Sequence, residues 1–127
     1  MAKTILLVED DQDILDIIYY LLTDEGYEVV RSKGAGVLEE VIKYKPDLVL
    51  LDHRLQIAWG ADICQALKAD PTTRQIPVVM MSATMGLEET ARNAGADDIL
   101  AKPFDIADIL KLVATYLGTA EHKSISR

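Results

Sequence analysis

Short, wholly apolar runs recur along the chain at Ile5–Val8, Leu48–Leu51 and Val78–Met81. Runs of this kind are typical of strands that are buried on both faces, as the strands of a parallel sheet are. Two weaker candidates lie at Tyr27–Arg31 and Asp98–Ala101. The pattern therefore predicts five short strands.

Between and after these runs, apolar residues recur every three or four positions, which is the spacing of one face of a helix. A glycine or a proline follows each of these stretches closely and marks its end. The predicted helices span Ile14–Leu22, Val37–Ile42, Ile63–Leu67, Leu87–Ala94 and Ile106–Leu117. The stretch Leu87–Ala94 has the thinnest apolar face.

Five strand–helix pairs with short connections predict an α/β fold. We expect a doubly wound parallel sheet with right-handed crossovers and the flavodoxin-like strand order 2-1-3-4-5. The length of 127 residues excludes an eight-stranded α/β barrel, which needs about 250 residues. We expect one domain at residues 1–118, with residues 119–127 forming a polar, flexible C-terminal tail and no room for an effector domain.

Composition narrows the class of partner. The chain carries 13 basic and 21 acidic side chains, a formal charge of −8, which argues against binding to nucleic-acid phosphates. Its apolar runs are too short for a signal peptide or a membrane span. The single cysteine, Cys64, cannot form an internal disulfide, which fits a reducing compartment. We therefore expect a cytoplasmic protein that binds neither nucleic acid nor membrane.

Polar residues follow four of the predicted strands, at the sheet edge where open α/β folds bind ligands. Asp10 and Asp11 follow the first strand, Asp52 the third, Ser82 the fourth and Lys102 the fifth. Each of these residues also has an ordinary structural reading. An aspartate before a helix is often an N-cap, and Ser82 and Lys102 can be read as a loop hydroxyl and a surface cation. Together, however, clustered carboxylates repel one another unless a cation or a proton relieves them. Carboxylate oxygens with free sites suit Mg²⁺.

In these residues the sequence resembles a known family, the receiver domains of two-component response regulators. The resemblance covers about residues 3–118. In length, the chain is most similar to the stand-alone chemotaxis-type and phosphorelay regulators. It rests on five motifs in the same order: Val8-Glu9-Asp10-Asp11, Asp47–Asp52 with Gly60, Met81-Ser82-Ala83, Gly95-Ala96-Asp97-Asp98, and Lys102-Pro103-Phe104.

The resemblance implies that Asp52 accepts a phosphoryl group from the phosphohistidine of a histidine kinase or phosphotransfer protein. It implies that Asp10, Asp11 and Asp52 hold magnesium, together with the backbone carbonyl of Arg54. Such a protein is not an enzyme in the usual sense, because it catalyses only its own phosphorylation and dephosphorylation.

The resemblance also assigns the remaining site residues and the output. Lys102 would pair with one phosphoryl oxygen, and the Ser82 hydroxyl would donate to another. The Lys102–Pro103 peptide would be cis. A protein target, or a second copy of the chain, would read the face formed by the fourth helix, fifth strand and fifth helix.

The chain departs from the family pattern in three places. Ile99 stands where many receivers carry a tyrosine or phenylalanine that moves with the serine or threonine. Leu55-Gln56 replaces a common Met-Pro pair, so this loop lacks the fixed φ of proline. Trp59 stands where a small or acidic residue is more usual, and we expect it to pack on its own loop. Strand alternation is expected to point His53 away from the acids and into a packed position.

Two other functions would use many of the same residues. A magnesium-dependent phosphatase with an aspartyl nucleophile would usually carry a second aspartate as general acid two residues after the nucleophile, where this chain has Arg54. A phosphorylation-independent interaction module is suggested by Ile99 and the altered loop. The intact set of Asp10, Asp11, Asp52, Ser82 and Lys102 argues against that module.

Overall fold

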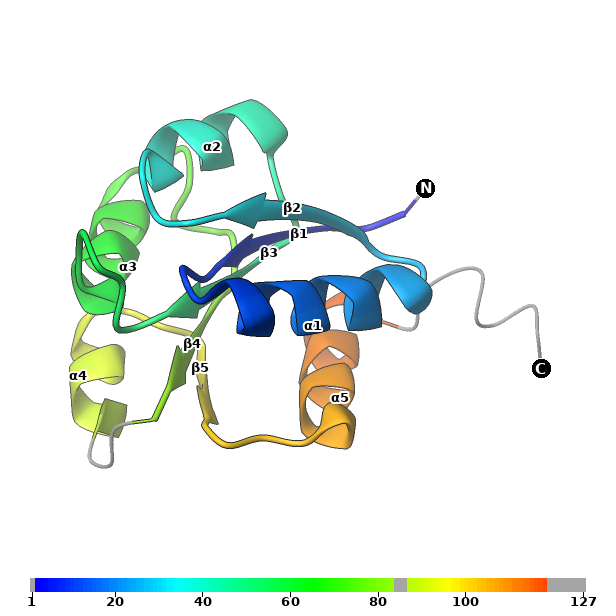
Figure 1. Ribbon diagram of the computed structural model, residues 1–127. Helices are drawn as coiled ribbons and strands as arrows, with labels where there is room; N and C mark the ends of the chain where they lie inside the picture. Colours follow the sequence, from blue (N-terminus) through cyan, green and yellow to red (C-terminus); the bar gives the residue numbers. More distant parts are fainter. Residues whose placement is uncertain (1, 84–86, 119–127) are drawn as a thin grey trace.

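A computed structural model describes residues 2–83 and 87–118, which form a central parallel sheet with a helix after each strand (Figure 1). The strands are β1 (Thr4–Val8), β2 (Glu28–Ser32), β3 (Leu48–Asp52), β4 (Val78–Ser82) and β5 (Asp98–Ala101). The helices are α1 (Gln12–Asp24), α2 (Val37–Tyr44), α3 (Gly60–Ala69), α4 (Leu87–Asn93) and α5 (Ile106–Leu117). The strand order is β2-β1-β3-β4-β5, which confirms the predicted doubly wound fold.

The sheet separates two apolar cores. Leu6 of β1 belongs to the core that includes Val41 of α2 and Leu67 of α3. Its neighbour Leu7 faces the other way and belongs to the core formed with α1 and α5. Figure 1 accordingly shows α1 and α5 on one face of the sheet and α2, α3 and α4 on the other. Because both faces of β1 are covered, its sequence is apolar without alternation.

The strands extend slightly further than their apolar runs. Both β3 and β4 include the polar residue that follows the run, so Asp52 and Ser82 are the last residues of their strands. Strand β2 lies one residue later than predicted, at Glu28–Ser32. Helix α3 begins at Gly60, before its first periodic apolar residue, because the first turn of a helix need not carry a core side chain.

Close backbone packing at Gly60 joins the start of α3 to the end of β3. A Cβ atom at this position would lie 2.5 Å from the carbonyl oxygen of Asp52 and 2.7 Å from Cα of His53. The Gly60 N–H donates to the His53 carbonyl at 2.7 Å. Only glycine allows this approach, and the contact holds the backbone that carries Asp52.

Among the described residues, the helices are all too short or too polar to cross a membrane.

Candidate functional site

Three carboxylates gather at the carboxyl ends of β1 and β3, which are neighbouring strands. Val8 is in register with Leu51, so the residues that follow Val8 lie beside the end of β3. One oxygen from each of Glu9, Asp10 and Asp52 lies within 4.8 Å of the others. Glu9 is 1% and Asp52 5% exposed. The structure thus brings together two of the three predicted acids, and Glu9 joins them.

The third predicted acid, Asp11, lies in a different position. It is the N-cap of α1, and its Oδ1 accepts hydrogen bonds from the N–H groups of Asp13 at 3.0 Å and Ile14 at 3.2 Å. Because α1 begins at the next residue, its unpaired first-turn N–H groups need such an acceptor. The Asp11 carboxylate therefore serves as a helix cap, and the three carboxylates that lie together are those of Glu9, Asp10 and Asp52.

Lys102 joins the buried carboxylates. Its Nζ lies 2.9 Å from Oδ1 of Asp52 and 3.1 Å from Oε1 of Glu9. Burial alone lowers the pKa of Lys102, but the hydrogen bonds and charges of Asp52 and Glu9 outweigh burial and raise this pKa. The lysine therefore stays charged at neutral pH. The Lys102–Pro103 peptide is cis, as the resemblance implied.

Glu9 lies in an environment that disfavours its ionised form. Burial, and then the charge of Asp52, raise the pKa of Glu9, while a hydrogen bond from the Asp11 N–H and the charge of Lys102 lower it. The net direction is upward. Ionised Glu9 therefore lowers the stability of the fold when no further cation is bound.

This shift predicts a pH dependence of stability. The pKa of Glu9 is higher in the folded than in the unfolded state, so its contribution falls as pH rises from the unfolded pKa through the folded pKa. Without divalent ions, we expect the melting temperature of the wild type minus that of Glu9→Gln to fall as pH rises above 4.5, the ordinary pKa of a glutamate. Thermal unfolding followed by circular dichroism measures this difference, and the exposed Glu89→Gln is the matched control. A difference that rises with pH would contradict the assignment.

Ser82 and Arg54 lie at the ends of β4 and β3. Ser82 is 5% exposed, and its carbonyl accepts the N–H of Lys102 at 2.7 Å. That bond ties the ends of β4 and β5 together beside the acid cluster. Arg54, two residues past Asp52, forms an isolated antiparallel bridge with Trp59. Arg54 thus begins the short loop that leads from β3 to α3.

His53 and Trp59 pack on each other as part of that loop. Their ring centroids are 5.1 Å apart, and the Arg54 guanidinium lies 6.0 Å from the Trp59 ring. His53 is buried, burial lowers its pKa, and its Nδ1 has no hydrogen-bond partner among the described residues. These positions confirm a packed His53 and a Trp59 that contacts its own loop.

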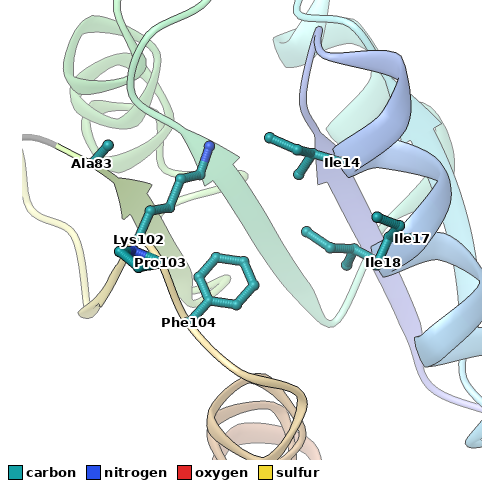
Figure 2. A pocket seen from close by; sticks show the side chains of 7 residues that line it. All are labelled: Ile14, Ile17, Ile18, Ala83, Lys102, Pro103 and Phe104. Atoms are coloured by element: carbon teal, nitrogen blue, oxygen red, sulfur yellow. The ribbon is translucent and has the colours of Figure 1, made fainter.

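An apolar cavity lies next to Lys102, between α1 and the connection from β5 to α5. It has a volume of about 470 Å³ and is lined by Ile14, Ile17, Ile18, Ala83, Lys102, Pro103 and Phe104. Figure 2 shows the aliphatic stem of Lys102 and the ring of Phe104 opposite the isoleucines of α1. The lysine therefore forms the boundary between an apolar surface and the acid cluster.

The acid cluster fits a hard divalent cation. Its three donors are carboxylates, and Mg²⁺ is a hard cation that prefers such oxygen ligands and keeps several waters. When all three are ionised, Lys102 offsets one negative charge and leaves two, which matches a divalent ion. A second cavity of about 300 Å³, lined by Asp10 and residues of the loop after β3, provides room for waters.

Comparison with known proteins points to one family. Residues 5–114 match the sequence model of the response regulator receiver domain. The polar-differentiation response regulator DivK of Brucella anthropi is 31% identical over 123 residues, which cover 94% of this chain and all of DivK.

Solved structures agree with this match. The receiver domain of a sensor histidine kinase from Pseudomonas aeruginosa, whose crystal structure has magnesium in the active-site cleft, is 28% identical with a TM-score of 0.84. The similarity covers 94% of this chain and all of that domain. The chemotaxis protein CheY4 of Vibrio cholerae shares the fold, at 23% identity and a TM-score of 0.84, over 91% of this chain and 99% of CheY4.

Proposed function

The chain belongs to the response regulator receiver domain family of two-component systems, and from this membership we propose that it accepts a phosphoryl group on Asp52. The donor is a histidine kinase or a phosphotransfer protein, and the reaction depends on magnesium. The receiver domain spans residues 1–118 and works in the cytoplasm. Asp52 acts as a phosphoacceptor for a signal, and turnover of free substrates is not its function.

The observation that carries this proposal is the environment of Asp52. Its carboxylate is 5% exposed, lies at the end of a central strand, and combines two acidic neighbours with one lysine at 2.9 Å. A carboxylate buried for purely structural reasons would be neutralised by its partner. Here the cluster retains negative charge that a divalent ion can balance.

The transfer step can be written for these residues. An oxygen of Asp52 attacks the phosphorus of phosphohistidine, a P–O bond forms and the P–N bond breaks. The imidazole nitrogen leaves with the electron pair and takes up a proton, and Asp52 becomes an acyl phosphate. A carboxylate nucleophile divides phosphohistidine hydrolysis into two easier steps, because water then attacks the acyl phosphate.

Bound Mg²⁺ supplies neutralisation of the charge on the phosphoryl oxygens. We propose that Asp10, Asp52 and Glu9 hold it, with the backbone carbonyl of Arg54 as a further ligand. Glu9 replaces Asp11 in this set because the Asp11 carboxylate caps α1.

Lys102 and Ser82 complete the proposed site. Lys102 would exchange its contact with Oδ1 of Asp52 for one with a phosphoryl oxygen, which keeps its charge paired throughout. The Ser82 hydroxyl, at the end of the strand next to β3, would donate to a second phosphoryl oxygen.

The same residues suggest how phosphorylation could be signalled to a partner protein. A phosphoryl group adds about 1.5 to 2 negative charges beside Ser82 and Lys102. The hydrogen bond from the Lys102 N–H to the Ser82 carbonyl links the ends of β4 and β5. We propose that movement there reaches the face formed by α4, β5 and α5, which a protein partner or a second copy reads. We expect the loop from Ala83 to Gly86 to shift, and its residues 84–86 lie outside the described residues.

This output predicts a pattern of NMR shifts. With magnesium and beryllofluoride, a mimic of the phosphoryl group, we expect backbone amide shifts across residues 84–112. A complete switch from 1:99 to 99:1 requires about 5.5 kcal/mol, and the bias should be smaller here because Ile99 has no ring to turn inward. Shifts confined to the loops around Asp52 would place the output elsewhere.

Phosphorylation by acetyl phosphate tests the proposed function without a cognate kinase. With Mg²⁺, intact mass spectrometry should show the addition of one phosphoryl group, and the addition should disappear when EDTA removes the metal. A mass that stays unchanged with magnesium present would overturn the proposal. Continuous release of phosphate from small phosphate esters would instead favour the phosphatase.

A further inference from the structure

The loop between β3 and α3 is a short hairpin. Arg54 and Trp59 form its bridge, and the Leu55 N–H donates to the Ala58 carbonyl at 3.2 Å. These contacts leave Gln56 and Ile57 at the turn. Since Arg54 comes two residues after Asp52, the hairpin begins at the edge of the sheet where the acid cluster lies.

The turn of this hairpin binds one acid of the cluster. The backbone N–H of Gln56 donates to Oδ2 of Asp10 at 2.6 Å. This bond joins two positions 46 residues apart, on the segments that follow β1 and β3. The donor is a neutral peptide group, so it orients the carboxylate without cancelling its charge, in contrast to the contacts of Lys102 with Asp52 and Glu9.

The hairpin is anchored independently of Asp10. Leu55 is 8% exposed and belongs to the core that includes β1, α2 and α3. Its side chain also packs on the loop after β2, where a Cβ atom at Gly34 would lie 3.1 Å from Cδ1 of Leu55. Burial of Leu55 therefore fixes the turn, and the Gln56 N–H is held in place before any ligand arrives.

The residue type at position 56 matters for this bond. Many receivers carry proline here, and proline has no backbone N–H. We infer that the backbone amide of Gln56 is a positioning group for the divalent-cation site, holding the Asp10 carboxylate in the orientation that brings one of its oxygens within 4.8 Å of oxygens of Glu9 and Asp52. The inference rests on the proposed function, because it takes Asp10 as a ligand of that cation.

The expected effect follows from the general behaviour of metal sites. Groups that hydrogen-bond to a ligand fix its orientation, and their removal costs about 10- to 100-fold in metal affinity. The opposing effect is that an N–H donor withdraws some charge from the carboxylate, which weakens its attraction for a cation. We expect orientation to dominate because Asp10 is partly exposed, so water can replace the lost donor electrostatically but cannot hold the carboxylate in place.

Three proteins test the inference: the wild type, Gln56→Ala and Gln56→Pro, each titrated with MgCl₂ in a calorimeter. Gln56→Ala removes the side chain and keeps the N–H, so its dissociation constant should stay within about twofold of the wild type. Gln56→Pro removes the N–H and should raise the dissociation constant about 10-fold or more, with the melting temperature measured without metal as a check on the fold. An unchanged or tighter constant in Gln56→Pro would overturn the inference.

A second measurement does not depend on the Gln56→Pro variant. In NMR of the metal-free protein, the Gln56 amide proton should be slow to exchange with solvent, and Asp10→Ala should speed its exchange by about 10-fold or more because the acceptor is gone. Fast exchange in the wild type, or no change in Asp10→Ala, would overturn the inference even if Gln56→Pro does not fold. A wild type that binds no Mg²⁺ in the calorimeter would overturn the proposed function instead, so the two failures are distinguishable.

Discussion

Replacing Asp52 by asparagine is expected to abolish phosphorylation by acetyl phosphate. The amide has nearly the shape of the carboxylate and still accepts a hydrogen bond from Lys102. It lacks the negative oxygen that attacks phosphorus, so the nucleophile is lost while the fold is retained. Intact mass spectrometry after incubation with acetyl phosphate and Mg²⁺ should show only the unmodified mass.

The matched control is Asp16→Asn, which changes a partly exposed aspartate of α1 whose side chain contacts Gln12 and Arg31. This variant should be phosphorylated to the same extent as the wild type. If Asp52→Asn is phosphorylated as fully as Asp16→Asn, another residue of the chain is the acceptor.

Replacing Lys102 by methionine is expected to cause a large loss of stability at neutral pH in the absence of magnesium. The side chains of Asp52 and Glu9 are 7% and 2% exposed, and both would lose the cation they contact. Removing one partner from a buried ion pair costs about 3–5 kcal/mol. We expect the lower end, about 3 kcal/mol, because Lys102 itself is 18% exposed.

The loss should depend on pH and on metal. At about pH 5 it should be smaller, because Glu9, whose pKa is already raised, can take up a proton in place of the lost cation. Saturating Mg²⁺ should also reduce it. Urea unfolding followed by circular dichroism gives the free energies, with Lys111→Met on the exposed face of α5 as the control. A loss that is equal at both pH values and insensitive to Mg²⁺ would show that Lys102 stabilises the fold by packing alone.

The fold was predictable because its central strands carry a strong signal. A strand covered on both faces must be apolar at every position, and the three apolar runs lie within β1, β3 and β4. The bounds of β2 carry a weaker signal because this strand lies at the sheet edge and has only two adjacent valines, set between Glu28 and Arg31. The start of α3 carried no apolar signal, because Gly60 is required by backbone contact with Asp52 and His53.

The site was predictable in its location but not in every member. Three acids follow β1 in sequence, and only the first residue of α1 decides which of them faces the sheet edge and which caps the helix. Helix α1 begins at Gln12, so Asp11 is the cap and Glu9 joins the cluster. The bond from Gln56 to Asp10 had no sequence signal beyond the missing proline, because it depends on how Leu55 packs the hairpin against the core.

Borohydride reduction locates the phosphorylated carboxyl group directly. Hydride converts an acyl phosphate to the alcohol and releases phosphate, so an aspartyl phosphate is left as homoserine. After the wild type has reacted with acetyl phosphate and Mg²⁺, peptide mass spectrometry should find homoserine at position 52 and unmodified side chains at Glu9 and Asp10. Reduction at Glu9 or Asp10, phosphate retained on a histidine, or no reduced residue at all would contradict Asp52 as the phosphoacceptor.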